Sequence, residues 1–91
     1  MGILLMNYLG EQVIAGNGAS QNATLPAGTK TVWVSPEGGV AYASVGAAGA
    51  AASSGFYVPQ NATRLVGPFS KIASLGVFAA VGVTVHLVYE G

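Results

Sequence analysis

The chain contains no cysteine and is unusually poor in charge. Of its 91 residues, three are Lys or Arg and three are Asp or Glu, so 7% are charged and the net charge is zero. A soluble domain carries about 25% charged residues and usually relies on a net charge away from zero to stay dispersed. This shortage predicts that much of the surface is covered by copies of the chain, by a larger assembly or by lipid.

The missing residue types also exclude several kinds of binding. Aspartate is absent, and the remaining classical metal ligands, Glu11, Glu37, His86 and Glu90, lack zinc- or calcium-type spacing. We therefore expect no metal and no cofactor. Three basic residues cannot form the positive footprint that a nucleic-acid-binding protein needs.

The small size of the chain suggests that it needs a source of stability beyond its own core. A domain of 91 residues has a limited core, and small scaffolds usually need a disulfide, a metal or a partner subunit. Because the first two are not expected here, the sequence predicts an obligate homo-oligomer, a trimer or larger.

No motif of the chain indicates catalysis. His86 is the single histidine and the one candidate general base near neutral pH, but no nucleophile-elbow serine motif accompanies it. Glu37 lies in a glycine-rich turn, so it is expected to be a solvated charge. The Gly16–Ala19 segment lacks the lysine of a phosphate-binding loop. The sequence predicts that the protein is not an enzyme.

The pattern of apolar residues predicts β-strands. Residues 83–90 alternate between two faces, as in a half-buried strand, and residues 75–79 are expected to pair with them as a hairpin. Residues 29–34 and 40–45 flank a turn containing Pro36 and two glycines, which predicts another hairpin. Further short strands are expected at residues 3–8, 12–15, 56–58 and 63–66.

These expected strands indicate an all-β protein, a small antiparallel β-sandwich or jelly-roll-like barrel. Residues 1–15 are expected to form an N-terminal arm or first strand, and residues 16–91 a single sandwich domain. Residues 46–55 consist of glycine, alanine and serine, which predicts a loop, with a tightly packed subunit contact or a short helix as the alternatives.

Several apolar side chains are candidates for subunit contacts. Trp33 and Tyr42 flank the first expected hairpin turn, so they should lie close together. Phe56 and Tyr57 are adjacent, so in a strand they point to opposite faces and at least one should leave the core. The candidate interface residues are Ile3, Leu4, Leu5, Met6, Trp33, Tyr42, Phe56, Tyr57, Phe69 and Phe78.

From Leu25 onwards the chain resembles small structural proteins of tailed bacteriophages. The resemblance lies in a Leu-Pro-Ala-Gly-Thr turn entering a Val-rich strand (25–34), a short aromatic strand (40–45), an apolar-Pro turn (58–59) and a terminal Val-Thr-Val strand within 75–88. It implies a β-sandwich module on a virion, in capsid decoration (cement) or in the tail. Its partners would be copies of itself and the major capsid protein or neighbouring virion proteins.

Two other functions remain open at this stage. Residues 72–89 contain no charged side chain over a length sufficient for one membrane span, although the β-type alternation argues against a helix there. Exposed aromatic residues on a sandwich would also suit a sugar-binding protein.

Overall fold

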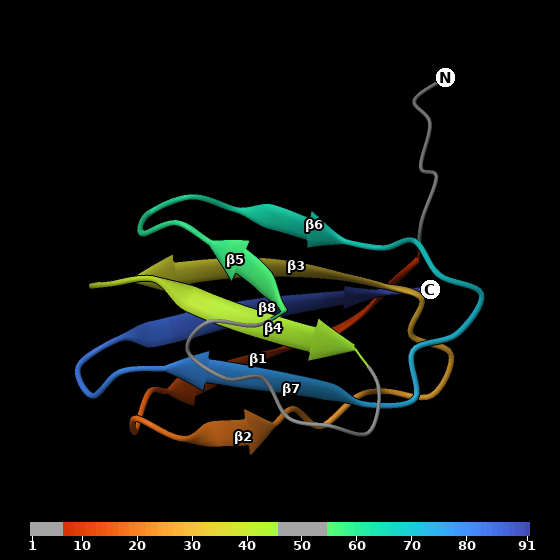
Figure 1. Ribbon diagram of the computed structural model, residues 1–91. Helices are drawn as coiled ribbons and strands as arrows, with labels where there is room; N and C mark the ends of the chain where they lie inside the picture. Colours follow the sequence, from red (N-terminus) through yellow and green to blue (C-terminus); the bar gives the residue numbers. More distant parts are fainter. Residues whose placement is uncertain (1–6, 46–54) are drawn as a thin grey trace.

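A computed structural model describes residues 7–45 and 55–91 as two four-stranded antiparallel sheets packed face to face (Figure 1). The expected Ile3–Met6 contact and most of the 46–55 segment lie outside the described residues. The strands are β1 (Tyr8–Ala15), β2 (Ser20–Asn22), β3 (Thr31–Glu37), β4 (Ala41–Val45), β5 (Phe56–Val58), β6 (Arg64–Val66), β7 (Leu75–Ala79) and β8 (Thr84–Glu90).

The strand order is that of a jelly roll. Sheet A has the order β1-β8-β3-β6, and sheet B, in front in Figure 1, has the order β2-β7-β4-β5. All the neighbouring strands are antiparallel. The all-β prediction and the sandwich architecture are therefore confirmed.

Consecutive strands mostly lie in different sheets. Every connection except the one from β4 to β5 passes from one sheet to the other. Both predicted hairpins are consequently wrong, although their strands exist. β3 pairs with β6 and β8, while β4 pairs with β5 and β7. In the same way β7 belongs to sheet B and β8 to sheet A.

The connections responsible are short enough to be mistaken for hairpin turns. Facing sheets are about 10 Å apart, a gap that three residues of extended chain can bridge. The link from β3 to β4 consists of Gly38, Gly39 and Val40. Gly38 has a φ of 90°, and a Cβ on Gly39 would lie 2.6 Å from Cγ2 of Val83. The two glycines thus allow the chain to turn sharply from sheet A into sheet B.

Local differences from the sequence expectation concern strand limits. β3 continues through Pro36 to Glu37, where a turn was expected, and β2 was not expected at all. Pro36 is fully buried. The expected strands 3–8 and 12–15 are replaced, within the described residues, by the continuous strand β1.

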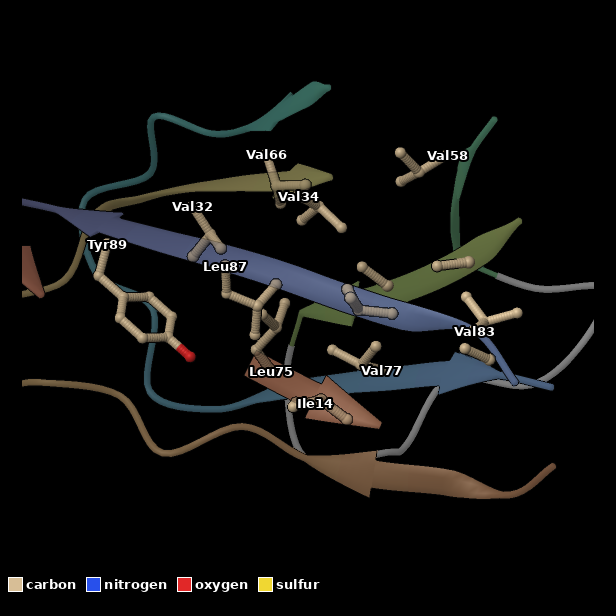
Figure 2. Packing of buried hydrophobic residues seen from close by; sticks show 14 of the residues in the cluster. Ile14, Val32, Val34, Val58, Val66, Leu75, Val77, Val83, Leu87 and Tyr89 are labelled. Atoms are coloured by element: carbon tan, nitrogen blue, oxygen red, sulfur yellow. The ribbon is translucent and has the colours of Figure 1, made fainter. Parts of the chain in front are cut away.

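One core lies between the sheets, as Figure 2 shows. Alternation places Val85, Leu87 and Tyr89 on the inner face of β8, as the sequence predicts. Leu75 and Val77 approach them from β7. The remaining buried apolar residues are Ile14, Val32, Val34, Ala41, Ala43, Val58, Val66, Ile72, Ala79 and Val83.

Side-chain contacts close the two open sides of the sandwich. On the β1 side, the Tyr89 hydroxyl donates to Gln12 Oε1 at 2.6 Å, and the Thr24 N–H donates to the same oxygen at 2.9 Å. On the β6 side, the Arg64 guanidinium lies 5.0 Å from the centre of the Phe56 ring. The Tyr89–Gln12 hydrogen bond joins two strands of sheet A, whereas the other two contacts link sheet A to sheet B, because Thr24 follows β2 and Phe56 lies in β5.

Candidate functional site

An aromatic row crosses the outer face of sheet B. Tyr42 lies opposite Phe78 of β7 on one side and opposite Tyr57 of β5 on the other. Directly opposed residues of antiparallel strands share a face. The rings of Tyr42 and Tyr57 are 5.4 Å apart and tilted by 60°, a favourable aromatic geometry. We call Phe78, Tyr42 and Tyr57 the aromatic row.

The surroundings of the aromatic row are small and uncharged. Ser20 of β2 lies opposite Phe78 and extends the row, while Asn22, Gly76 and Ser44 form the next line across the strands. None of the strand residues that the structure places on this face is charged. Tyr57 is 46% exposed. The face can thus bind a partner with little loss of ion hydration.

The outer face of sheet A has the opposite character. It carries all three carboxylates of the chain, Glu11, Glu37 and Glu90, together with His86. Trp33 Nε1 donates to Glu90 Oε1 at 2.7 Å, and His86 Nε2 lies 3.3 Å from Glu37 Oε1. Glu90 and Glu37 thus each have a polar partner within the same face.

The sheet A carboxylates and His86 lie on the same face but are not gathered into one cluster. Within residues 7–45 and 55–91, no group of three potential metal-ligating side chains exists. His86 Nε2 lies 3.3 Å from Glu37 Oε1, and both side chains are exposed to solvent.

The structure separates the aromatic residues that the sequence analysis grouped as candidate contacts. Tyr42, Tyr57 and Phe78 come together, whereas Phe56 points inward and packs against the core. The expectation that one of the adjacent pair Phe56 and Tyr57 leaves the core is confirmed. Phe69 lies in the connection between β6 and β7 and is 37% exposed.

Trp33 does not lie beside Tyr42, contrary to the sequence expectation. The two residues occupy outward positions of β3 and β4, but these strands belong to different sheets, so Trp33 and Tyr42 face opposite sides of the molecule. Trp33 is half-buried, opposite Val88 and Leu65. The sequence did not predict the aromatic row. Its members come from three strands, and the alternation of apolar residues does not specify how those strands pair.

The comparisons give no relative from which a function could be carried over. No family of known proteins matches the chain, and neither a curated protein nor a solved structure matches it. In the part of the chain described, no helix has the length and apolar character to cross a membrane. The 72–89 segment contains β7 and the strand part of β8 up to Tyr89, which lie in different sheets, so it does not form one helical span.

Proposed function

We propose that the chain is a non-enzymatic virion structural protein, a capsid decoration (cement) or tail-associated subunit that assembles with copies of itself and with neighbouring virion proteins. The observation that carries this proposal is the uncharged outer face of sheet B with its aromatic row. Aromatic residues are enriched, and charged residues depleted, in the centres of protein interfaces.

The distribution of charge supports contact through sheet B rather than sheet A. All carboxylates lie on the outer face of sheet A, where Glu90 and Glu37 have partners within the same chain. Burying that face would require removing water from these ions, which is costly unless a partner compensates them. Burying the sheet B face removes mainly ring and small polar surfaces from water.

The mode of action follows from these surfaces. A partner would rest on the aromatic row, and hydroxyl and amide groups such as those of Ser20, Asn22 and Ser44 would supply hydrogen bonds at its margin. The resemblance to phage structural proteins and the jelly-roll order, which recurs in viral capsid domains, support a virion as the setting. Because one fold can have many functions, the proposal depends mainly on the chemistry of the sheet B surface.

Mass spectrometry of purified virions tests the proposal. Particles of the virus that encodes the chain should contain it in a fixed copy number relative to the major capsid protein. A variant with Tyr57→Lys should be made and folded but incorporated far less than one with Val88→Lys on the sheet A face. Wild-type chain that is abundant in infected cells but absent from particles would refute the virion assignment.

Sugar binding is the second candidate function, favoured by the aromatic row beside polar side chains. Tyr42 and Tyr57 offer ring faces, and Asn22 and Ser44 offer hydrogen-bonding groups, on one surface. A glycan array with the wild-type protein and with Tyr57→Ser distinguishes the two functions. Binding that disappears in the variant would support a sugar site, and an array without signal would remove this candidate.

A further inference from the structure

β1 differs from the other edge strands of the sandwich in length. The two sheets have four edges, formed by β1 and β6 in sheet A and by β2 and β5 in sheet B. β2, β5 and β6 each have 3 residues, whereas β1 has 8. Short edge strands are one of the ways in which proteins prevent edge-to-edge pairing, and lysine or proline on the edge is another. β1 is long and contains neither lysine nor proline, and its one charged residue is Glu11.

The register of β1 and β8 shows which backbone groups are used inside the sheet. The Gly16 N–H donates to the Val83 carbonyl at 2.7 Å. Hydrogen-bonded and non-hydrogen-bonded pairs alternate along antiparallel strands. Ile14 and Gln12, at two-residue intervals from Gly16, therefore exchange their hydrogen bonds with β8.

Glu11, Val13 and Ala15 consequently direct their N–H and C=O groups away from β8, towards the open edge. A contact at the end of the strand supports this direction, because the Ala15 carbonyl accepts a hydrogen bond from Gln21 Nε2 at 2.8 Å. A carbonyl oxygen has a second lone pair for another donor. Before Glu11, a register shift between Tyr8 and Gly10 interrupts the regular edge. The usable edge is therefore the five residues from Glu11 to Ala15.

We propose that this edge pairs with the same edge of a second copy of the chain, in antiparallel orientation with Val13 opposite Val13 of the second copy. The inference rests on the proposed assembly function and names one of its contacts. It would join two sheets A into one continuous sheet of eight strands, β6-β3-β8-β1 followed by the same strands of the second copy in reverse order.

Self-complementarity selects a second copy and this register. With Val13 on the two-fold axis, Glu11 lies opposite Ala15 of the second copy, and all three outward residues find hydrogen-bonding partners. A shift that placed Glu11 opposite its own copy would set two carboxylates side by side, which is destabilising. The Val13 side chain is 61% exposed and would be covered by its counterpart. A two-fold contact of this kind closes at two copies, so a larger oligomer uses a second surface, such as the aromatic row.

Single cysteines in this cysteine-free chain test the register directly. In the proposed hydrogen-bonded pairing, the two copies of Val13 have Cα atoms about 5.5 Å apart, so thiols at this position lie within reach of a short bifunctional thiol crosslinker. The two copies of Ala15 are displaced by four residues, about 13 Å along the strand, which is beyond the reach of such a reagent. Val13→Cys should therefore form a covalent dimer with the crosslinker, whereas Ala15→Cys should not. An equal mixture of Glu11→Cys and Ala15→Cys chains should form the mixed dimer.

Replacing the outward N–H provides an independent test by sedimentation. Val13→Pro removes a donor that the β1–β8 ladder does not use, and proline is tolerated at such edge positions. We expect this variant to raise the dimer dissociation constant about tenfold or more, and Val13→Lys to do likewise. The control Val13→Thr keeps the N–H and a β-branched side chain, so it should dimerise like the wild type. Circular dichroism of each variant verifies the fold.

Defined results would overturn the edge proposal. If folded Val13→Lys associates as tightly as the wild type, or if Ala15→Cys crosslinks as readily as Val13→Cys, β1 is not the contact. In either case, the assembly function would still be supported if the variant kept the oligomeric mass of the wild type or if the chain were found in purified virions. A wild-type chain that is absent from virions but still forms the Val13→Cys dimer would refute the virion assignment and retain the edge pairing.

Discussion

Sheets A and B contribute similar aliphatic side chains to a shared core, but their outer faces differ in chemistry. The outer face of sheet A bears every carboxylate of the chain and the single histidine. The outer face of sheet B bears an aromatic row among small polar residues, without a charge on its strands. The contrast shows that the acidic side chains of the sequence are not distributed evenly over the two outer faces. They lie on sheet A and leave the strands of sheet B uncharged on the outside.

The largest expected effect tests whether the two sheets depend equally on the common core. Leu87 in sheet A and Leu75 in sheet B are both fully buried. Leu87→Ala and Leu75→Ala should each lower the free energy of unfolding by roughly 2–5 kcal/mol, measured by urea denaturation. The control Val81→Ala, at a site that is 78% exposed, should change it by less than about 0.5 kcal/mol. A large loss for one leucine alone would show that one sheet folds without the other.

A smaller loss of stability should follow from adding a side chain at Gly16, which directly follows β1. A Cβ on Gly16 would lie 2.1 Å from the carbonyl oxygen of Ala80, beside the end of β7 in sheet B. Gly16→Ala should therefore cost roughly 1–3 kcal/mol of stability through overpacking. Gly18→Asn is the matched control, because nothing lies within 4 Å of a Cβ there and asparagine tolerates the positive φ of 79°. Equal midpoints in thermal unfolding would contradict this close approach of the sheets.

One lysine on each face tests the functional contrast. Tyr57→Lys places a charge in the aromatic row and should shift the light-scattering mass towards the monomer, because an uncompensated charge resists burial. Val88→Lys places the same charge on sheet A, opposite Glu11, and should leave assembly unchanged. Both variants should retain the wild-type free energy of unfolding within about 1 kcal/mol, measured by urea denaturation. Dissociation caused by Val88→Lys alone would reverse the roles of the two faces.

Alkaline pH tests the burial of the Tyr89 hydroxyl on the inner face of sheet A. Burial raises the pKa of Tyr89 to about 12, whereas tyrosine in an unfolded chain ionises near pH 10. The folded state therefore holds this proton more tightly. The resulting stability is complete below pH 10 and is lost as the pH rises from 10 through 12. Urea midpoints of the wild type should fall in this window, and those of Tyr89→Phe should fall less steeply.

The smallest effect is expected for the ion pair on sheet A. The side chains of His86 and Glu37 are 48% and 71% exposed, and exposed pairs contribute about 0–1 kcal/mol. His86→Gln should leave both stability and assembly at wild-type levels, measured by denaturation and light scattering. Loss of assembly with an intact fold would show that sheet A also takes part in contacts.

The sequence predicted strands far better than their partners. Alternation identified the inner positions of β8, such as Val85 and Leu87, because the period of two is a local property of the chain. It could not specify pairing, because a hairpin and a connection across the core need the same alternation on both strands. Gly38 and Gly39 suit either connection. What decides between them is the arrangement of all eight strands around one core, which no short segment contains.

The candidate contacts illustrate the same limit. Tyr42, Tyr57 and Phe78 were each identified as candidates, but their meeting on one face depends on the register of β4 with β5 and β7. Trp33 was misplaced because the error in the hairpin moved it to the wrong side of the molecule. The sequence also could not predict that β1 lies at the edge of sheet A, because an edge strand is defined by the absence of a neighbouring strand on one side.

The crossing connections also determine how the chain must fold. β1 pairs with β8 along almost its whole length, so residues 69 to 82 positions apart in the sequence have to meet before sheet A is complete. Folds dominated by such distant pairings reach the native state slowly, and their unpaired strands are exposed to aggregation meanwhile. During synthesis, β1 leaves the ribosome long before β8 exists. The order of translation therefore leaves both edges of β1 open at the stage when other copies of the chain are being made nearby.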